Sequence, residues 1–320
     1  DINVDAIILA AGEGARLKGW TGDKPKGMMT LGNAPILEHI IHGLAASGIQ
    51  KINMVVGYRK NIVMSYFGDG SKYSTKINYI EQPKLSGTLD ALQLGLDGIS
   101  KDFLLVPGDN YVSSASFIPL ILSTNSALLA GRADRWSKWG EIEFIGSKAR
   151  ITFDNPEAFG RLHFTGIMKL STEVAESLIN AGGRHLGEAL QNIETSVDFD
   201  VINSEFWHNI VYPWDLIDGN RLALQNLFLS KSGKIERNVV MKGPISIGSG
   251  SVICSGCYLE GPISIGDNCI IGSFVTIRNS LLLNNVHIQD GSKIGVKGFG
   301  FIPIQGKNIK FPHIGKVIIK

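Results

Sequence analysis

Hydrophobic and polar positions follow two different rhythms along the chain. Over roughly the first 230 residues, short apolar runs such as residues 6–10, 52–56 and 103–106 alternate with segments such as 36–44 that place apolar groups at helical spacing. Uninterrupted apolar runs of this length are typical of strands buried on both faces. The alternation predicts an α/β domain with a mixed, mostly parallel sheet and helices on both of its faces.

From Ile235 onward, aliphatic side chains recur at every sixth residue. The main series is Ile235, Met241, Ile247, Ile253, Leu259, Ile265, Ile271, Ile277 and Leu283, and a second series of smaller residues is Val239, Ile245, Ser251, Cys257, Ile263, Cys269, Val275 and Leu281. This period predicts a triangular, left-handed parallel β-helix of hexapeptide repeats, with both series stacked inside it. We expect the phase to slip near residues 286–294.

A polar stretch at residues 230–234 separates the two patterns. A chain of 320 residues is long for a single core, so we expect two domains, residues 1–230 and residues 231–320. Because Lys320 falls inside what reads as a coil, we expect the β-helix to be very short or the chain to be truncated.

Bulk composition narrows the classes of function. Hydrophobic residues make up 44% of the chain, charged residues 19%, and the formal net charge is +2. This balance gives no general field that would attract nucleic acid or an anionic membrane. No apolar run is long enough to span a membrane and the N-terminus reads as a strand, so we expect a cytoplasmic protein. Three cysteines do not indicate a disulfide framework, and Cys254 with Cys257 lacks the second pair of a zinc site.

The first apolar run leads into a loop suited to a phosphate chain. Gly12 and Gly14 allow a ligand to approach the backbone closely, and Arg16 and Lys26 are cations that can meet several phosphate oxygens. Two common phosphate loops are excluded. The dinucleotide fingerprint needs a third glycine where Leu17 stands, and the P-loop needs a Gly-Lys-Ser/Thr ending that is absent.

The loop resembles the signature of sugar-1-phosphate nucleotidylyltransferases, the family of glucose-1-phosphate thymidylyl- and uridylyltransferases and UDP-N-acetylglucosamine pyrophosphorylases. The spacing from Leu9 through Arg16 and Thr21 to Pro25 and Lys26 follows the family without insertion, with Ala15 at the usual threonine. The resemblance implies a Rossmann-like nucleotide-diphospho-sugar transferase fold. It also implies Arg16 and Lys26 as catalytic residues and a nucleotide-binding loop of Leu9, Ala10, Ala11, Gly12 and Gly14.

Two further stretches, residues 81–88 and 107–110, resemble family motifs in the expected order. The resemblance implies that Gln82, Gly87 and Thr88 bind the nucleotide, with Gln82 at the edge of a pyrimidine base. A primary amide can donate to O4 and accept from N3–H, which suits uracil and thymine equally. The resemblance further implies that Asp109 and Asn209 hold Mg²⁺, for which carboxylate and carbonyl oxygens are suitable ligands.

Residues that the resemblance assigns to the sugar lie in a more divergent region. Gly140, Thr165 and Gly166 fall where the family places its sugar-contacting loops, and Asp154 begins the counterpart of a usual Glu-Lys-Pro. Asn155 replaces that lysine and removes one positive charge from the acceptor site.

The sequence therefore predicts an enzyme that transfers a nucleotidyl group from UTP or dTTP to a sugar 1-phosphate with Mg²⁺. Two alternatives remain. Residues 298–301 resemble a Gly-Phe-Gly-Phe insertion of glucosamine N-acyltransferases, so the β-helix could transfer an acyl group, although no histidine matches their base. The chain could also be a non-catalytic regulatory subunit, a possibility that retention of Arg16, Lys26 and Asp109 disfavours. Open coil edges lead us to expect a homo-oligomer.

Overall fold

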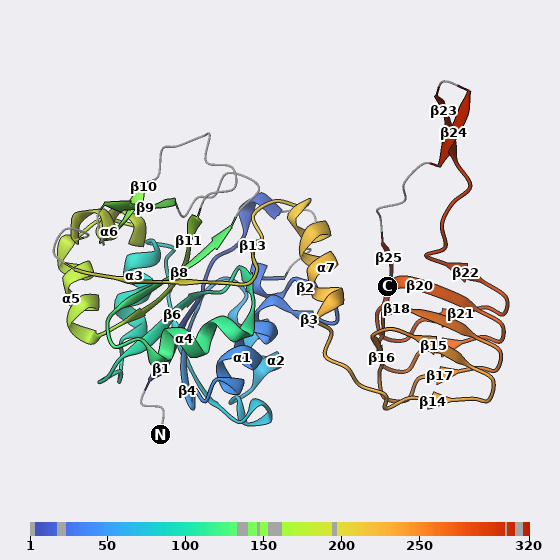
Figure 1. The fold of residues 1–320 in the computed structure, drawn as a ribbon. Coiled ribbons are helices and arrows are strands. Elements are labelled where there is room, and N and C mark those ends of the chain that lie inside the picture. Colours follow the sequence, from blue (N-terminus) through green and yellow to red (C-terminus); the bar gives the residue numbers. More distant parts are fainter. Residues whose placement is uncertain are drawn as a thin grey trace. The chain divides into compact units, whose positions relative to one another are not determined.

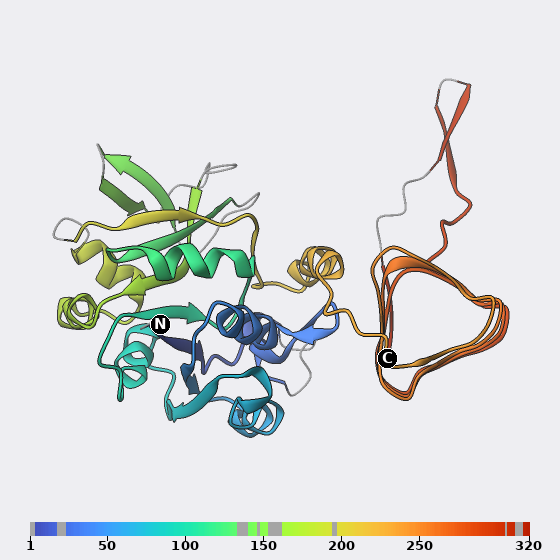
Figure 2. The ribbon, with the colours of Figure 1, turned by 60° about the horizontal axis from the view of Figure 1, so that its bottom comes forward.

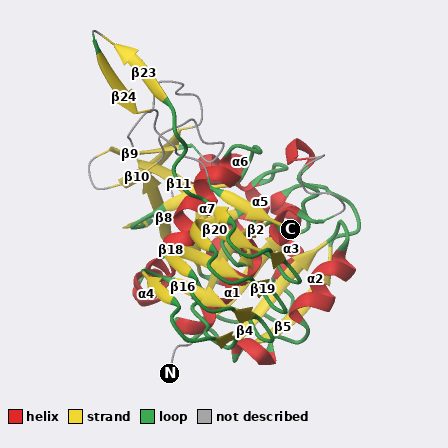
Figure 3. Ribbon diagram, turned by 90° about the vertical axis from the view of Figure 1, so that its right-hand side faces the viewer, coloured by secondary structure: helices red, strands yellow, loops and turns green. Residues whose placement is uncertain are grey.

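The computed structural model describes residues 4–17, 24–132, 140–145, 148–152, 162–193, 197–304, 306–310 and 316–320. The chain forms two compact units, one of residues 1–29 and 35–215 and the other of residues 30–34 and 216–320. Helices and strands alternate along most of the first unit, whereas short strands dominate the second (Figure 3). Among the described helices, none has the length and apolarity that crossing a bilayer requires.

The second unit starts before the linker at residues 230–234, because helix α7 (Asp215–Gln225) is bonded to an early hairpin. The hairpin joins β2 (Thr30–Leu31) and β3 (Ala34–Pro35). Its Gly32 N–H donates to Asn220 Oδ1 at 2.9 Å, and Asn33 Nδ2 donates to the Phe228 carbonyl at 2.9 Å. The division into domains of residues 1–230 and 231–320 stays a prediction.

The first unit is built on a nine-stranded sheet, which confirms the mostly parallel arrangement predicted from the alternating pattern (Figure 1). The central order is β10-β9-β11-β6-β1-β4-β5, with β8 beside β11 and β12 beside β8. Strands β6, β1, β4 and β5 run parallel, and β11 is antiparallel to its neighbours. The strands are β1 (Asp5–Ala10), β4 (Lys51–Val56), β5 (Lys76–Glu81), β6 (Phe103–Pro107), β8 (Ala127–Arg132), β9 (Glu141–Ile145), β10 (Lys148–Thr152), β11 (Leu162–Leu170) and β12 (Asp200–Asn203).

Helices cover the sheet and bury its apolar side chains. One buried cluster joins Ile7, Val55 and Leu105 of the central strands to the three helices α3, α5 and α6. Asn53, also buried, ends α3 by donating to the carbonyls of Gly95 and Asp97 at 2.9 and 2.8 Å. The helices of this unit are α1 (Ile36–Ala46), α2 (Lys60–Phe67), α3 (Thr88–Gly95), α4 (Phe117–Leu122), α5 (Thr172–Ala181) and α6 (Leu186–Ile193).

A short antiparallel pair, β7 (Asn110–Val112) and β13 (Trp207–Asn209), closes the first unit beside the carboxyl end of β6. Asn110 is fully buried, and both polar atoms of its side-chain amide form hydrogen bonds within the protein. Its Nδ2 donates to the Thr165 carbonyl at 2.9 Å, and its Oδ1 accepts from Trp207 Nε1 at 2.8 Å. These two bonds tie β7 to β11 and to β13, next to Asp109 and close to Asn209.

The second unit contains the predicted parallel β-helix, whose coils are seen end on as stacked triangles in Figure 2. Val240 pairs with Tyr258 and Tyr258 with Thr276, which is three hexads per coil. A hairpin of β23 (Phe301–Ile304) and β24 (Lys307–Lys310) extends away from the coils. The coil strands are β14 (Lys234–Ile235), β15 (Val240–Lys242), β16 (Ile245–Ile247), β17 (Val252–Ile253), β18 (Tyr258–Ile265), β19 (Ile270–Ile271), β20 (Thr276–Leu282), β21 (His287–Ile288), β22 (Lys293–Ile294) and β25 (Val317–Ile319).

The phase of the repeat slips earlier than the sequence predicted. Up to Arg278 the register keeps three hexads per coil, but Ile263 pairs with Ser280 and Ile265 with Leu282, one residue short. A shift of one residue exchanges the inner and outer faces of a strand. Leu282 therefore fills the interior that was predicted for Leu283, and Ser280 stands opposite Ile263 in place of Leu281.

Ser251 shows how a polar residue is accommodated inside the β-helix. Its side chain is fully buried in the second interior series. Its Oγ donates to the Gly266 carbonyl at 2.7 Å and accepts from the Cys269 N–H at 2.8 Å. One hydroxyl thereby satisfies two backbone groups of the next coil.

We predict that Ser251→Ala lowers the free energy of unfolding by about 1 to 3 kcal/mol, because both backbone groups lose a buried partner. Urea denaturation of the whole chain measures this change. Ser249→Ala, in the same coil but exposed, is the control and should change stability by less than about 0.5 kcal/mol. Equal effects of the two substitutions would contradict the assignment.

Candidate active site

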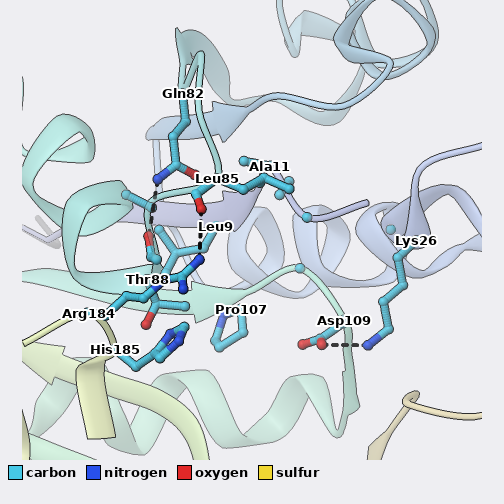
Figure 4. A pocket seen from close by; sticks show the side chains of 16 residues that line it. Leu9, Ala11, Lys26, Gln82, Leu85, Thr88, Pro107, Asp109, Arg184 and His185 are labelled. Carbon is cyan, nitrogen blue, oxygen red and sulfur yellow. Dashed lines mark hydrogen bonds and ion pairs between the residues drawn. The ribbon is translucent and has the colours of Figure 1, made fainter. Parts of the chain in front are cut away.

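A cavity of about 280 Å³ opens at the carboxyl ends of β1, β5 and β6 (Figure 4). Because these strands are parallel, the loops that follow them meet at one edge of the sheet. The cavity is lined by Leu9, Ala10, Ala11, Gly12, Lys26, Gly27, Gln82, Leu85, Gly87, Thr88, Ala91, Pro107, Gly108, Asp109, Arg184 and His185. It therefore gathers most of the nucleotide-binding residues predicted from the sequence together with Lys26 and Asp109.

The loop after β1 leaves open backbone beside the cavity. A Cβ placed on Gly12 would meet no atom within 4 Å, so a ligand can reach this backbone. Gly14 does not line the cavity but shapes the loop. Its φ is +71°, its carbonyl accepts from the Leu17 N–H at 2.8 Å, and a Cβ there would lie 3.0 Å from the Lys26 side chain. A glycine at position 14 thus lets Lys26 pass close to the loop.

Arg16 lies outside the cavity lining. Its guanidinium carbon is 5.8 Å from the centre of the Tyr212 ring, and Tyr212 stacks on Trp214 with ring centres 4.8 Å apart. The Arg16 side chain is exposed, so this contact restrains it weakly. It is free to turn toward a polyanion held by the loop.

Lys26 and Asp109 form an ion pair at one end of the cavity (Figure 4). Lys26 Nζ is 2.7 Å from Asp109 Oδ2, and the two side chains are 14% and 16% exposed. Each charge is thereby compensated while it is shielded from most water. A ligand that brings both phosphates and a cation could exchange partners with both residues.

Asn209 lies next to Asp109 across the pairing of β7 with β13. Asn209 is in register with Asn110, and the Ile210 N–H donates to the Asp109 carbonyl at 3.2 Å. Asn209 Oδ1 is shielded from solvent and accepts no hydrogen bond from the described residues. A shielded amide oxygen on the strand next to Asp109 is a suitable ligand for Mg²⁺, which takes few protein ligands and completes its shell with water and phosphate. No cluster of three or more His, Cys, Asp or Glu was found in the described parts of the chain.

The Gln82 amide is oriented by its neighbours. Its Nε2 donates to Asp90 Oδ2 at 2.8 Å and to the Gly87 carbonyl at 3.1 Å, with Ser86 Oγ at 3.3 Å. Because an amide nitrogen carries two hydrogens, these acceptors use its donor capacity and leave Oε1 for a ligand. Hydrogen bonds from Ser86 and Gln82 lower the pKa of the Asp90 carboxyl, so it stays ionised at neutral pH.

Gly87 is required by a close approach of two loops. Its φ is +122°, and a Cβ on it would lie 2.0 Å from the Arg184 carbonyl oxygen. The same carbonyl accepts from the Leu89 N–H at 3.3 Å, and Arg184 Nη2 donates to the Leu85 carbonyl at 3.2 Å. Residue 87 can approach the neighbouring chain only because it lacks a side chain.

Arg184 and His185 line the cavity but were missed by sequence analysis. They lie between α5 and α6, and the Leu186 N–H at the start of α6 donates to Thr88 Oγ1 at 2.9 Å. The Gly182-Gly183 pair marks a turn, but a turn signal says nothing about where the turn docks. Thr88 therefore has its hydroxyl engaged with this loop.

The residues predicted to bind the sugar do not line the cavity. Gly140 and Gly166 both have a φ of +83°, and the Gly140 carbonyl accepts from the Phe164 N–H at 3.0 Å. Thr165 is fully buried, with Oγ1 donating to the Leu129 carbonyl at 2.9 Å. Asp154 lies outside the described residues. The sugar-binding role of these residues stays a prediction.

Comparison with known families matches both parts of the chain. The sequence model described as "Nucleotidyl transferase" matches residues 5–128. The one described as "Bacterial transferase hexapeptide (six repeats)" matches residues 244–279.

Relatives agree with these matches. The bifunctional protein GlmU of Methanococcus vannielii is 35% identical over 329 residues, covering 98% of this chain and 76% of the relative. The UTP–glucose-1-phosphate uridylyltransferase AglF of Haloferax volcanii is 40% identical over 107 residues, covering 33% of this chain and 44% of the relative. A solved structure of a glucose-1-phosphate thymidylyltransferase from Bacillus anthracis superposes with a TM-score of 0.61, at 20% identity, over 71% of this chain and 98% of that chain. At this identity the last match supports the fold alone.

We predict that Gly87→Ala lowers the free energy of unfolding by at least about 2 kcal/mol, because a methyl group must displace the Arg184 carbonyl and residue 87 must keep a strained φ. Gly68→Ala is the matched control. Gly68 also has a positive φ, +59°, but open space around it, so about 1 kcal/mol is expected. Urea denaturation compares the two, and similar losses would show that the contact with Arg184 is unimportant.

Proposed function

The chain belongs to the family of sugar-1-phosphate nucleotidyl transferases that carry hexapeptide repeats, and from this premise we propose that it joins UTP or dTTP to a sugar 1-phosphate, releasing pyrophosphate. The observation that carries the proposal is the cavity itself. Its one end offers the Gln82 amide oxygen, which can accept from N3–H of uracil or thymine. Its other end offers open backbone, Lys26 and Asp109 for a triphosphate.

UTP is the favoured of the two nucleotides. The relative AglF, named as a UTP–glucose-1-phosphate uridylyltransferase, is 40% identical over the matched 107 residues. Uracil and thymine present the same hydrogen-bonding edge, so the amide of Gln82 does not separate them. The residues that line the cavity do not indicate which sugar 1-phosphate is the substrate.

Catalysis in this proposal is a matter of holding two polyanions in line. The attacking group is an oxygen of the sugar phosphate, which is already anionic and needs no general base. Lys26 neutralises the transferred phosphoryl group after leaving Asp109. Arg16, held loosely over Tyr212, turns to the departing pyrophosphate and stabilises the charge that develops there.

Mg²⁺ would be held by Asp109 and by the shielded Oδ1 of Asn209. When bound, it would neutralise phosphate oxygens and align them for displacement. The pair with Lys26 engages Oδ2 of Asp109, so a metal bound to this carboxylate would also alter the ion pair.

The acceptor site is proposed to lie beside the strands β9 and β11, where Gly140, Thr165 and Gly166 are found. Thr165 uses its hydroxyl and its carbonyl within the fold, so its side chain would shape the site and not bind sugar directly. Asp154 stays a candidate, and Asn155 in place of the family lysine lowers the positive charge available to the sugar phosphate.

The β-helix is proposed to serve assembly of a homo-oligomer. Several apolar side chains of its hairpin region are exposed, and Phe299 is 94% exposed. Acyl transfer is the second candidate, because the relatives are named bifunctional. Consumption of acetyl-CoA with glucosamine 1-phosphate by the intact chain would establish it.

Pyrophosphate release from a panel of four nucleoside triphosphates and several sugar 1-phosphates tests the main proposal. Activity with UTP or dTTP is the expected result. Failure with every pair, by a chain shown to be folded, would contradict it and favour a non-catalytic role.

We predict that Arg16→Ala lowers kcat by two or more orders of magnitude, since loss of one preorganised charge contact costs about 3 to 4 kcal/mol of barrier in comparable sites. Among the described residues the exposed side chain has one weak contact, with the Tyr212 ring, so the melting temperature should not change. Steady-state kinetics and thermal denaturation measure the two effects. Normal turnover in a stable variant would remove Arg16 from the mechanism.

We predict that Asp109→Asn abolishes Mg²⁺-dependent activity while Asn209→Asp is tolerated, because aspartate supplies the same oxygen to the metal. Binding of Mn²⁺ in the presence of nucleotide, followed by its paramagnetic signal, gives a second readout. Lys26→Met is the control for loss of the ion pair: it should impair turnover but retain the metal. Loss of metal binding in all three variants would count against the assignment.

A further inference from the structure

We infer that Asp90 is a positioning residue that makes Gln82 an obligate acceptor, so that the site rejects cytosine nucleotides. The inference rests on the proposed function, since it concerns how the base of the nucleotide is chosen. Asp90 lies in the first turn of α3 and is absent from the cavity lining. It acts on the base through Gln82 and not by touching it.

The contacts of the amide define its orientation. Gln82 is 4% exposed, and its Nε2 faces two groups that can only accept, the Asp90 carboxylate at 2.8 Å and the Gly87 carbonyl at 3.1 Å. Turning the amide over would set its Oε1 against both oxygens. The reversed amide would lose both hydrogen bonds and place oxygen against oxygen at each of them, which favours the observed orientation.

Asp90 is itself held in place by its neighbours. Ser86 Oγ donates to the same Oδ2 that receives the Gln82 N–H. The carboxylate thus receives two donors from one loop and stands at the N-terminal end of a helix, where negative charge is favoured. A neutral side chain at position 90 would hold neither donor as firmly.

With the amide in this orientation, the site can discriminate between pyrimidine bases by the group at N3. Uracil and thymine carry a hydrogen on N3, which the Gln82 oxygen can accept. Cytosine has a lone pair on N3 and would face that oxygen acceptor to acceptor. An unmatched buried polar pair costs roughly a factor of 5 to 150 in affinity, so we expect UTP to be preferred over CTP by about 100-fold.

The test is the ratio of kcat/KM for UTP to that for CTP, with the ratio of dissociation constants measured by calorimetry as a second readout. Asp90→Asn can present its amide N–H₂ to a reversed Gln82, so the ratio should fall about tenfold, chiefly through a gain with CTP. Ser86→Ala, which removes one anchor of Asp90, should lower it less. Asp97→Asn, just beyond the end of α3 and exposed, is the matched charge control and should leave the ratio unchanged.

The outcomes separate this inference from the proposed function. A wild-type ratio near 1, or an Asp90→Asn variant that loses both nucleotides equally, overturns the role of Asp90 even if UTP is a good substrate. If the wild-type chain turns over neither nucleotide, the proposed reaction fails, while the binding ratio still decides the inference. Failure to bind either nucleotide overturns both.

Discussion

Parallel hydrogen bonding between β6, β1, β4 and β5 is the constraint on which the first unit depends. It makes these strands end at one edge of the sheet, so that loops far apart in the sequence form one cavity. The Gly108 N–H donates to the Leu9 carbonyl at 2.9 Å and the Gln82 N–H to the Val56 carbonyl at 2.8 Å, which extends the ladder to the first residues of these loops. The chemically important groups are therefore positioned by rigid backbone and not by flexible connections.

Much of this arrangement could be predicted from the sequence because it follows from local pattern. A short stretch of sequence is enough to recognise a buried strand, the glycines of the first loop or the six-residue period. Arg184 and His185 could not be found this way, since their place in the cavity depends on the α5–α6 loop docking against Gly87, which is distant in the sequence. The one-residue slip at Ser280 was predicted too late in the chain, near residues 286–294, for a related reason. The period of a sequence shows that coils repeat, but it does not show which residues of neighbouring coils pair.

Lys26 and Asp109 balance each other's charge before any ligand arrives. Lys26 and Asp109 are mostly shielded, and either one alone would bear a desolvation penalty. Pairing them keeps the cavity stable and also keeps both residues in reach of a substrate that brings opposite charges of its own. The hydrogen bond between Gln82 and Asp90 also has two effects. It stabilises the wall of the pocket, and it determines that the oxygen of the amide is the atom left for a ligand.

The hairpin of β23 and β24 has a consequence for how such a chain can change over time. It lies between β22 and β25, yet Leu281 of β20 still pairs with Ile318 of β25, so the stack resumes after the excursion. In a solenoid each coil touches only its neighbours, and a loop that leaves and returns at one corner costs little closure entropy as it lengthens. This corner is therefore a place where sequence can be gained, lost or exchanged over evolution without rebuilding the stacked coils.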